Sequence, residues 1–251
     1  MPRLSLAAAL AVALLAVPAA RTTAGDPPEG FVNLFNGKDF TGWKVPKGDN
    51  GHWKIMKGVI DYDAKSEAKG DKNLWSEKKY RDFVLRIDWR LKTDPGFKNK
   101  VPIILPDGSH KKGDDGKDIR VEIEDVDSGI YLRGQSKAQV NIWMWPVGSG
   151  EVYGYRTDTN MPPKVRAGVT PKVKADNPRG EWNTFEITMK GDRLWVTLNG
   201  KEVISNAQLP GVAEEGPLAL QHHGSFNTKT GQWTGPPSLV QFRNIYIKEL
   251  K

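Results

Sequence analysis

Residues 83–91, FVLRIDWRL, carry a large apolar side chain at every second position, and three of the four positions between them are charged. Successive side chains of a β-strand point to opposite faces of the sheet, so this period of two predicts a strand with one buried face. Antiparallel sheets that are covered on one side commonly carry such a pattern. The buried face is expected to hold Phe83, Leu85, Ile87, Trp89 and Leu91.

Other strand signals recur along the chain. We expect a strand within 182–189, with Phe185 and Ile187 inward, and a last strand at 239–247. Asn199-Gly200 is a strong hairpin signal between 194–198 and 202–204. Lys57-Gly58 indicates a similar turn between 53–55 and 59–61.

Helix signals are scarce, because no apolar run with helical spacing extends beyond two turns. Segments 92–118 and 157–180 are rich in residues that favour turns and are expected to form long loops. Many short strands joined by Gly- and Pro-containing turns favour an antiparallel sandwich or barrel.

The chain of 251 residues suits one sizeable domain. Arg3, the apolar run 4–17 and the small residues that follow it are typical of a secretory signal peptide, and the run is too short for a membrane span. We therefore expect residues 1–24 to be removed, 25–30 to be a linker and 31–251 to form the domain. The mature protein is expected to be secreted or periplasmic, with no membrane anchor.

The charge pattern gives no indication of nucleic-acid binding. The formal net charge is +7, but basic and acidic residues are interleaved and no nucleic-acid motif is visible. The chain has no cysteine, so its stability must come from a large core rather than from disulfides.

One stretch has an unusual polar face. Residues 128–145, SGIYLRGQSKAQVNIWMW, contain two alternating runs. One face is plainly apolar, with Ile130, Leu132, Val140, Ile142 and Met144. The opposite face is expected to be accessible and suited to a sugar, because it carries aromatic rings, an arginine and amides: Tyr131, Arg133, Gln139, Asn141, Trp143 and Trp145.

Seven motifs follow one another in a recognisable order. They are FVNLFNGKDFTGW (31–43), HWKIMKGVIDY (52–62), RDFVLRIDWRLK (81–92), SGIYLRG (128–134), GEWNTFEITMKGDRLWVTLNGKEV (180–203), GPLALQHHG (216–224) and VQFRNIYIKEL (240–250). This succession resembles the 3-keto-disaccharide hydrolase family over roughly residues 30–250. The resemblance implies a concanavalin-like jelly-roll β-sandwich of two antiparallel sheets, usually exported, that acts on carbohydrates. Relatives often carry Asn where Asp127 stands and Glu where Gln139 stands.

The activity implied by the resemblance is cleavage of glycosides whose sugar is oxidised to a ketone at C3. The ketone acidifies the C2 hydrogen, so a base can remove it and the C1 substituent then leaves by elimination. Such a site needs a general base, an electrophile for the enolate oxygen and an acid for the leaving group. A divalent metal ion is another part that could serve.

Candidate catalytic residues are His222, His223 and Glu124. Histidine titrates near neutral pH, and alternation on a strand sends the two histidines to opposite faces, which leaves the choice between them open. Glu124 and Asp127 are candidates for base or metal ligand. For substrate binding we expect Asp127 and the polar face, namely Arg133, Gln139, Asn141, Trp143 and Tyr131.

Two other functions fit the same sequence. A non-catalytic glycan-binding module could use the same fold and the same polar face. A retaining glycosidase would need paired carboxylates, for which Glu122, Glu124 and Asp127 are the available cluster. Under every alternative the partner is a carbohydrate.

Overall fold

The computed structural model describes residues 26–92 and 96–251. The predicted signal peptide, residues 1–24, lies outside the described residues. Within the described ranges, neither helix has the length and apolar character that a bilayer crossing requires.

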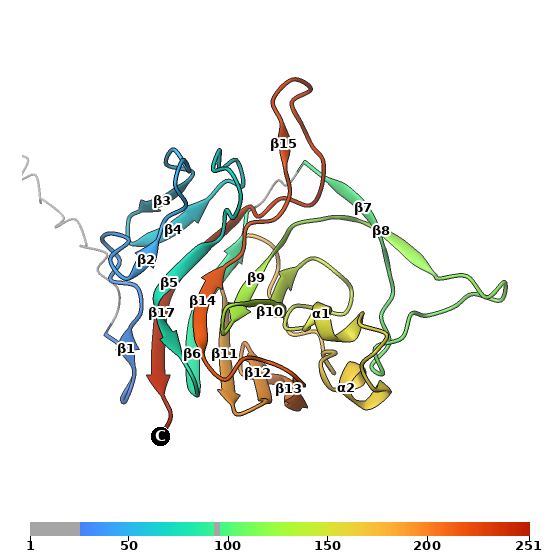
Figure 1. The fold of residues 1–251 in the computed structure, drawn as a ribbon. Coiled ribbons are helices and arrows are strands. Elements are labelled where there is room, and N and C mark those ends of the chain that lie inside the picture. The colour runs from blue at the N-terminus through green and yellow to red at the C-terminus, as the bar shows by residue number, and fades with distance from the viewer. Residues whose placement is uncertain (1–25, 93–95) are drawn as a thin grey trace, which may run out of the picture.

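The larger sheet has eight strands, all paired antiparallel (Figure 1). From one edge to the other they are β13 (Lys201–Gln208), β12 (Arg193–Leu198), β11 (Asn183–Lys190), β6 (Phe83–Leu91), β17 (Val240–Glu249), β4 (Val59–Tyr62) and β3 (Trp53–Met56), with β1 (Val32–Asn33) paired to β17.

The second sheet has five antiparallel strands and lies against the first (Figure 1). Its order is β10 (Gln135–Trp143), β9 (Asp127–Leu132), β14 (Gly216–Leu220), β5 (Leu74–Tyr80) and β2 (Trp43–Lys44). Two ribbons and two short helices complete the described residues: β7 (Lys98–Pro102) with β8 (Arg120–Glu124), β15 (Phe226–Asn227) with β16 (Gln232–Trp233), α1 (Tyr153–Arg156) and α2 (Pro163–Gly168).

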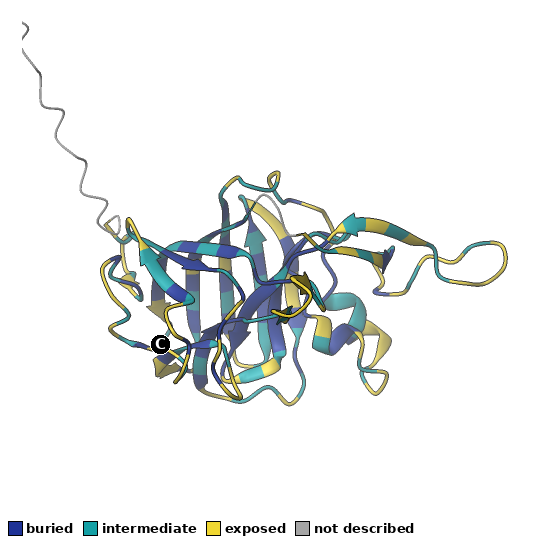
Figure 2. Ribbon diagram, turned by 90° about the horizontal axis from the view of Figure 1, so that it is seen from above, coloured by how far each residue is buried: buried dark blue, intermediate teal, exposed yellow. Residues whose placement is uncertain are grey.

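The core lies between the two sheets, where the apolar faces meet. All five apolar residues predicted for the inner face of β6 are buried. They form one cluster with Ile130 and Leu132 of β9 and Val140 and Ile142 of β10. Figure 2 shows the same division between buried strands and exposed connections. Each such side chain contributes about 1.5–3 kcal/mol on burial. The prediction of a jelly-roll sandwich of two antiparallel sheets is confirmed.

Both predicted tight turns are present. Asn199 and Gly200 have φ of 51° and 77°, and Lys57 and Gly58 have φ of 51° and 78°. Positive φ at both central residues is the signature of the hairpin turn whose twist matches that of the flanking strands. The Asn-Gly and Lys-Gly pairs thus set the registers of β12–β13 and β3–β4.

The two predicted long loops contain regular structure. Segment 92–118 includes β7 and two further bridges, Ile104 with His110 and Lys112 with Asp118. Segment 157–180 includes α2. The β7–β8 ribbon reaches away from the sandwich (Figure 1), and its first strand, KNKVP, has no apolar alternation. Helix α2 is too short for its period to be recognised.

The polar face of β9 and β10 is covered, contrary to the expectation that it is open. Gln139, Asn141 and Trp143 are all buried. Helix α1 packs directly on β10, since a Cβ placed on Gly154 would lie 2.6 Å from the Lys137 carbonyl oxygen. The covering elements turn this face into the floor of a cavity.

Candidate functional site

A cavity of about 330 Å³ lies over the outer face of β9 and β10. Its floor comes from these two strands, and its walls come from β7, α1 and the segment after β14. The lining residues are Asn99, Asp125, Asp127, Ser136, Gln139, Asn141, Trp143, Trp145, Tyr153, Gly154, Gln221, His223 and Pro236. The cavity therefore combines two carboxyl groups, a histidine, four amides and three aromatic rings.

Asp127 holds the most perturbed carboxyl group of the cavity. Burial raises its pKa to about 7, with the charge of His223 opposing the shift and that of Asp125 adding to it. Its Oδ1 is buried and has no hydrogen-bond partner in the structure. Its Oδ2 lies 3.9 Å from Nε2 of His223. A carboxyl group that titrates near pH 7 is suited to general acid–base catalysis at neutral pH.

Asp125 lies deeper than Asp127, and its Oδ2 has a hydrogen-bond partner. It accepts a hydrogen bond of 2.8 Å from Nδ2 of Asn99 on β7. Burial raises the pKa of Asp125, and hydrogen bonds from Asn99 and Trp145 oppose the shift. The carboxyl group of Asp125 thus ties the ribbon to the cavity and keeps a second negative charge near Asp127.

His223 is held in one orientation. Its Nδ1–H donates to the Pro236 carbonyl oxygen at 2.7 Å, and its backbone N–H donates to Ser238 Oγ at 2.6 Å. Ser238 Oγ in turn donates to the backbone carbonyl of Asp127 at 2.7 Å. With Nδ1 fixed on a carbonyl, the imidazole presents Nε2 toward the carboxyl group of Asp127.

His222 lies outside the cavity lining. Its Nδ1 accepts the Tyr62 hydroxyl hydrogen bond at 2.6 Å, and its backbone N–H donates to Asn73 Oδ1 at 2.8 Å. Burial lowers the pKa of His222 to about 4, so this ring is neutral at physiological pH. The two histidines point to different sides, as alternation predicts, and His223 is the one that reaches the cavity.

The side-chain amides on the cavity floor differ in whether they already have hydrogen-bond partners. Gln139 Nε2 donates to Gln221 Oε1 at 2.6 Å and to the Ser128 carbonyl oxygen at 3.2 Å. The Gln139 side chain lies directly over Gly129, where an added Cβ would come within 2.3 Å of Nε2. Asn141 Oδ1, in contrast, is buried with no partner in the structure. The amide of Asn141 is therefore available to a ligand.

An aromatic group forms one wall. Trp143 and Trp145 stack with ring centroids 4.5 Å apart and planes 5° apart, and Tyr153 meets both edge-on. Trp143 Nε1–H donates to the Gly148 carbonyl oxygen at 2.7 Å, which fixes the stack. Trp143 is buried, whereas Tyr153 is 44% exposed. Flat rings with an accessible face suit the apolar face of a pyranose.

Three further predicted site residues, besides His222, are not among those that line the cavity. Arg133 ends β9 with φ of 50°, and its guanidinium donates to three carbonyl oxygens and to Asp82. Glu124 is half exposed and pairs with Arg179 at 2.5 Å. Tyr131 is buried beside Trp75. The expectation that Arg133 shares a binding face with Gln139 is corrected by the turn, which sends the arginine elsewhere.

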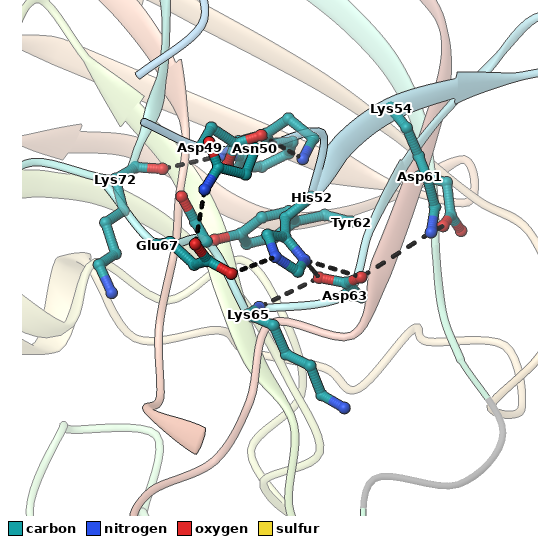
Figure 3. Close-up of polar contacts among 12 residues, drawn as sticks. Asp49, Asn50, His52, Lys54, Asp61, Tyr62, Asp63, Lys65, Glu67 and Lys72 are labelled. Carbon is teal, nitrogen blue, oxygen red and sulfur yellow. Dashed lines mark hydrogen bonds and ion pairs between the residues drawn. The ribbon is translucent and has the colours of Figure 1, made fainter. Parts of the chain in front are cut away.

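A second polar cluster lies at the β3–β4 hairpin (Figure 3). His52 Nδ1 is 2.9 Å from Asp63 Oδ1, and its Nε2 is 3.9 Å from Glu67 Oε1. Asn50 Nδ2 also donates to Glu67 at 2.5 Å. These partners satisfy the carboxylates of the cluster and fasten residues 50–67, so we assign it a structural role. Among the described residues, no group of three or more His, Cys, Asp or Glu is placed to hold a metal ion.

Several lining residues were not singled out from the sequence. Asn99 comes from β7 and Tyr153 from α1, and neither element has a periodic signal. Asp125 lies between the candidates Glu124 and Asp127, and Gln221 lies within the motif 216–224 beside His222. Trp145 belongs to the predicted polar face with Trp143. The missing information was which segments cover the polar face.

Solved structures with a similar fold come from Parabacteroides distasonis ATCC 8503. A candidate glycosyl hydrolase matches with a TM-score of 0.54 and 22% identity, over 89% of this chain and 95% of that chain. A second matches with a TM-score of 0.55 and 21% identity, over 88% and 84%. These likenesses concern the fold. Among curated proteins, none matches the chain.

The family assignment comes from a sequence model. The model of the 3-keto-alpha-glucoside-1,2-lyase-like domain matches residues 30–248. This match spans both sheets and every residue that lines the cavity. The chain therefore belongs to the 3-keto-alpha-glucoside-1,2-lyase-like domain family and is a carbohydrate-active protein.

Proposed function

We propose that the protein is a carbohydrate-active hydrolase or lyase that cleaves glycosidic bonds of 3-keto sugars by C2 proton abstraction and elimination. The observation that carries the proposal is the Asp127–His223 pair in a cavity with an aromatic wall. Family membership supports the substrate class. The raised pKa of Asp127 supports its use as a base near neutral pH.

Asp127 takes the proton in the first step. Its carboxylate removes the hydrogen from C2, and the electron pair of that C–H bond forms the C2–C3 double bond of an enolate whose charge rests on the former ketone oxygen. Asn141 lines the same cavity, and we assign its Nδ2–H as the donor to that charge, because an amide oxygen can only accept. A hydrogen-bond donor placed where charge develops lowers the barrier.

His223 serves the second step. The enolate returns its electrons to form the C1–C2 double bond while the bond from C1 to the departing oxygen breaks. Protonated His223 gives its proton from Nε2 to that oxygen, so the pair passes from carboxylate and imidazolium to carboxylic acid and imidazole. Addition of water to the C1–C2 double bond then yields the free 3-keto sugar. Asp127 stabilises the imidazolium before transfer, because the two groups lie 3.9 Å apart.

The test compares a 3-keto disaccharide with its unoxidised parent, each with and without a chelator. Cleavage of the keto form alone supports the proposal. Cleavage of the parent would instead identify a retaining glycosidase, and binding without cleavage would identify a glycan-binding module. Loss of activity with the chelator would add a metal ion to the mechanism.

The two histidines give a matched pair of variants. We expect His223→Ala to lower kcat/KM for the keto substrate about 10²- to 10⁴-fold, the usual contribution of general acid–base catalysis. His222→Ala is expected to keep the chemistry, because this ring contacts Tyr62 rather than the cavity, and to lower thermal stability through the lost buried hydrogen bond. Full activity in His223→Ala would contradict the assignment.

The pH dependence follows from the pKa of Asp127. Only the ionised carboxylate can accept the C2 proton, so kcat/KM should fall as pH decreases through about 7. A profile measured from pH 5 to pH 9 on the keto disaccharide checks this. A rate that stays flat down to pH 5 would exclude Asp127 as the base.

Gly129 offers a test of the floor. We expect Gly129→Ala to displace Gln139 from its bonds to Gln221 and Ser128, because the new Cβ would overlap Nε2. Overpacking of this kind costs about 1–3 kcal/mol of stability. Urea unfolding and kcat/KM of the variant measure the two effects. As a control, Gly168→Ala places a Cβ at an ordinary distance of 3.8 Å from Ala207, at a position without a positive φ.

We also propose export, on the basis of the apolar N-terminal run. Expression of the full chain in a bacterial host followed by fractionation and mass measurement checks it. A mature N-terminus within residues 18–25 is expected, and an intact cytoplasmic chain would contradict the proposal.

A further inference from the structure

Beside the candidate site lies a second cavity of about 290 Å³. It shares Asn99, Trp145 and Tyr153 with the first cavity, so these residues form the boundary between the two. The remaining lining comes from the ribbon and from α1: Lys100, Val101, Pro102, His110, Arg120, Arg156 and Thr157. A glycoside bound with one ring at Asp127 can therefore extend past Tyr153 into this neighbouring space.

The second cavity is lined by basic groups and by no carboxyl group. Within the described residues, neither Lys100 nor Arg120 forms an ion pair with an acidic side chain. The guanidinium of Arg120 donates to the Lys100 carbonyl oxygen at 2.8 Å, which holds the two residues together across the ribbon. Glu122, which lies opposite Lys100 in the register, has its contact with Lys98 instead.

The deeper basic side chains of this cavity already have acidic partners. Arg156 is buried and paired with Glu151, and its guanidinium lies 5.3 Å from the centre of the Tyr153 ring. His110 Nδ1 is 2.8 Å from Asp118. The contact between this segment and α1 is that of the Arg156 guanidinium with His110 Nε2, at 3.4 Å. Lys100 and Arg120, which have no acidic partner among the described residues, are left at the rim of the cavity.

The two cavities have opposite electrostatic character. The first holds Asp125 and Asp127, and the second holds unpaired cations a short way along the same groove. We infer that the second cavity binds an anionic substituent, such as a carboxylate or phosphate, on the sugar unit that departs from the 3-keto ring. This inference rests on the proposed function and names the substrate class within it. Arginine and lysine bind such groups through charge-assisted hydrogen bonds.

The decisive experiment compares three 3-keto-glucosyl substrates that differ only in the departing unit. One ends in glucose, one in glucuronate and one in glucose 6-phosphate. At low salt we expect kcat/KM for one of the anionic substrates to exceed that for the neutral one by at least about tenfold, the effect of one charge-assisted hydrogen bond. The preference should shrink in 0.5 M NaCl, because salt at about this concentration strongly screens exposed charges. The preferred anion distinguishes a uronate from a phosphate.

Variants test whether Lys100 and Arg120 cause the anionic preference. The double variant Lys100→Ala and Arg120→Ala is expected to lose the anionic preference while keeping its rate on the neutral substrate. Lys98→Ala is the matched control, because Lys98 is on the same strand, is 71% exposed and does not line either cavity. Equal rates on all three substrates, or a preference that persists in the double variant, would overturn the inference.

Binding measurements keep this result separate from the fate of the proposed chemistry. Calorimetry with unoxidised glucosyl-glucuronate, glucosyl-glucose 6-phosphate and glucosyl-glucose needs no cleavage. One outcome is that no keto substrate is cleaved but an anionic disaccharide binds more tightly, and the double variant removes the difference. That outcome supports anion binding in the basic cavity and contradicts the proposed reaction. If the keto substrates are cleaved without any anionic preference, the proposed reaction is supported and anion binding in the basic cavity is contradicted.

Discussion

Replacement of Asp127 by asparagine is expected to lower kcat/KM on a 3-keto disaccharide about 10³-fold. The substitution keeps the size of the side chain and removes only the ability to accept a proton, which is the role that general base catalysis requires. The side chain of Asp127 is 18% exposed and lines the cavity, so its carboxylate is within reach of the C2 hydrogen of a bound sugar. Steady-state kinetics on the keto disaccharide measure the loss.

The matched control is Glu124→Gln. Glu124 is the acidic residue that the sequence favoured as a base, and the structure places its carboxylate on Arg179 rather than in the cavity. We expect this variant to keep its rate within a factor of about two, since exposed ion pairs contribute little. A large loss in Glu124→Gln together with a small loss in Asp127→Asn would reverse the assignment.

The stability of Asp127→Asn should change in the opposite direction to its activity. Burial raises the pKa of Asp127 above the ordinary value of 3.8 to about 7, so the folded state disfavours ionisation. The ionised carboxylate therefore costs stability as pH rises from about 4, and the full cost is reached above about 7. We expect the variant to melt at a higher temperature than the native protein at pH 8 and at a similar temperature at pH 4. Equal melting temperatures at pH 8 would contradict the pKa shift.

The strands could be predicted because each buries one face on the core. Alternation identified β6 and the two runs that became β9 and β10, and the Asn-Gly pair identified the hairpin at Asn199. It also separated Gln139 and Asn141 from the core residues between them. These predictions depend on neighbours within the same strand, whose directions are fixed by the backbone.

The segments that cover the site could not be predicted from alternation. Asn99 lies on β7 and Tyr153 on the four-residue helix α1, and neither of these short elements leaves a hydrophobic period in the sequence. The carboxyl group of Asp127 gains its raised pKa from this cover. The same residue on an open sheet would be an ordinary surface acid.

The interpretation of Gln139 also changes with the structure. Relatives often carry glutamate here, and the sequence raised the question of a missing catalytic carboxylate. In the structure the amide nitrogen of Gln139 donates to two oxygen atoms, of Gln221 and of Ser128. A glutamate would place a carboxylate against the Ser128 carbonyl oxygen. In this chain an amide is therefore the group that fits at position 139, and Asp127 supplies the carboxylate of the site.

Arg133 shows where the alternation rule stops. The residue follows the last paired residue of β9 and has a left-handed φ of 50°, so its side chain no longer keeps the parity of Tyr131. Its side chain is 1% exposed and donates to carbonyl oxygens of Arg81, Gly191 and Ala213 as well as to Asp82. The guanidinium thus holds together the ends of three separate segments.

We expect Arg133→Met to lower the free energy of unfolding by about 3 kcal/mol. Removal of one partner of a buried ion pair typically costs about 3–5 kcal/mol. The lower end applies because Asp82 is 26% exposed and keeps a 2.8 Å hydrogen bond from the Gly191 N–H. Urea unfolding measures the loss, with an unchanged slope of the free energy of unfolding against urea concentration.

The activity of the same variant decides between the two roles considered for Arg133. Below its unfolding transition, folded Arg133→Met should retain the native kcat/KM, because the guanidinium contacts carbonyl oxygens and Asp82 and does not line the cavity. Arg81→Ala, which removes an exposed ion pair to Glu214, is the control and should change stability by less than about 1 kcal/mol. A raised KM in Arg133→Met at native stability would instead restore the arginine to the substrate site, and would require a binding face that extends beyond the cavity at Asp127.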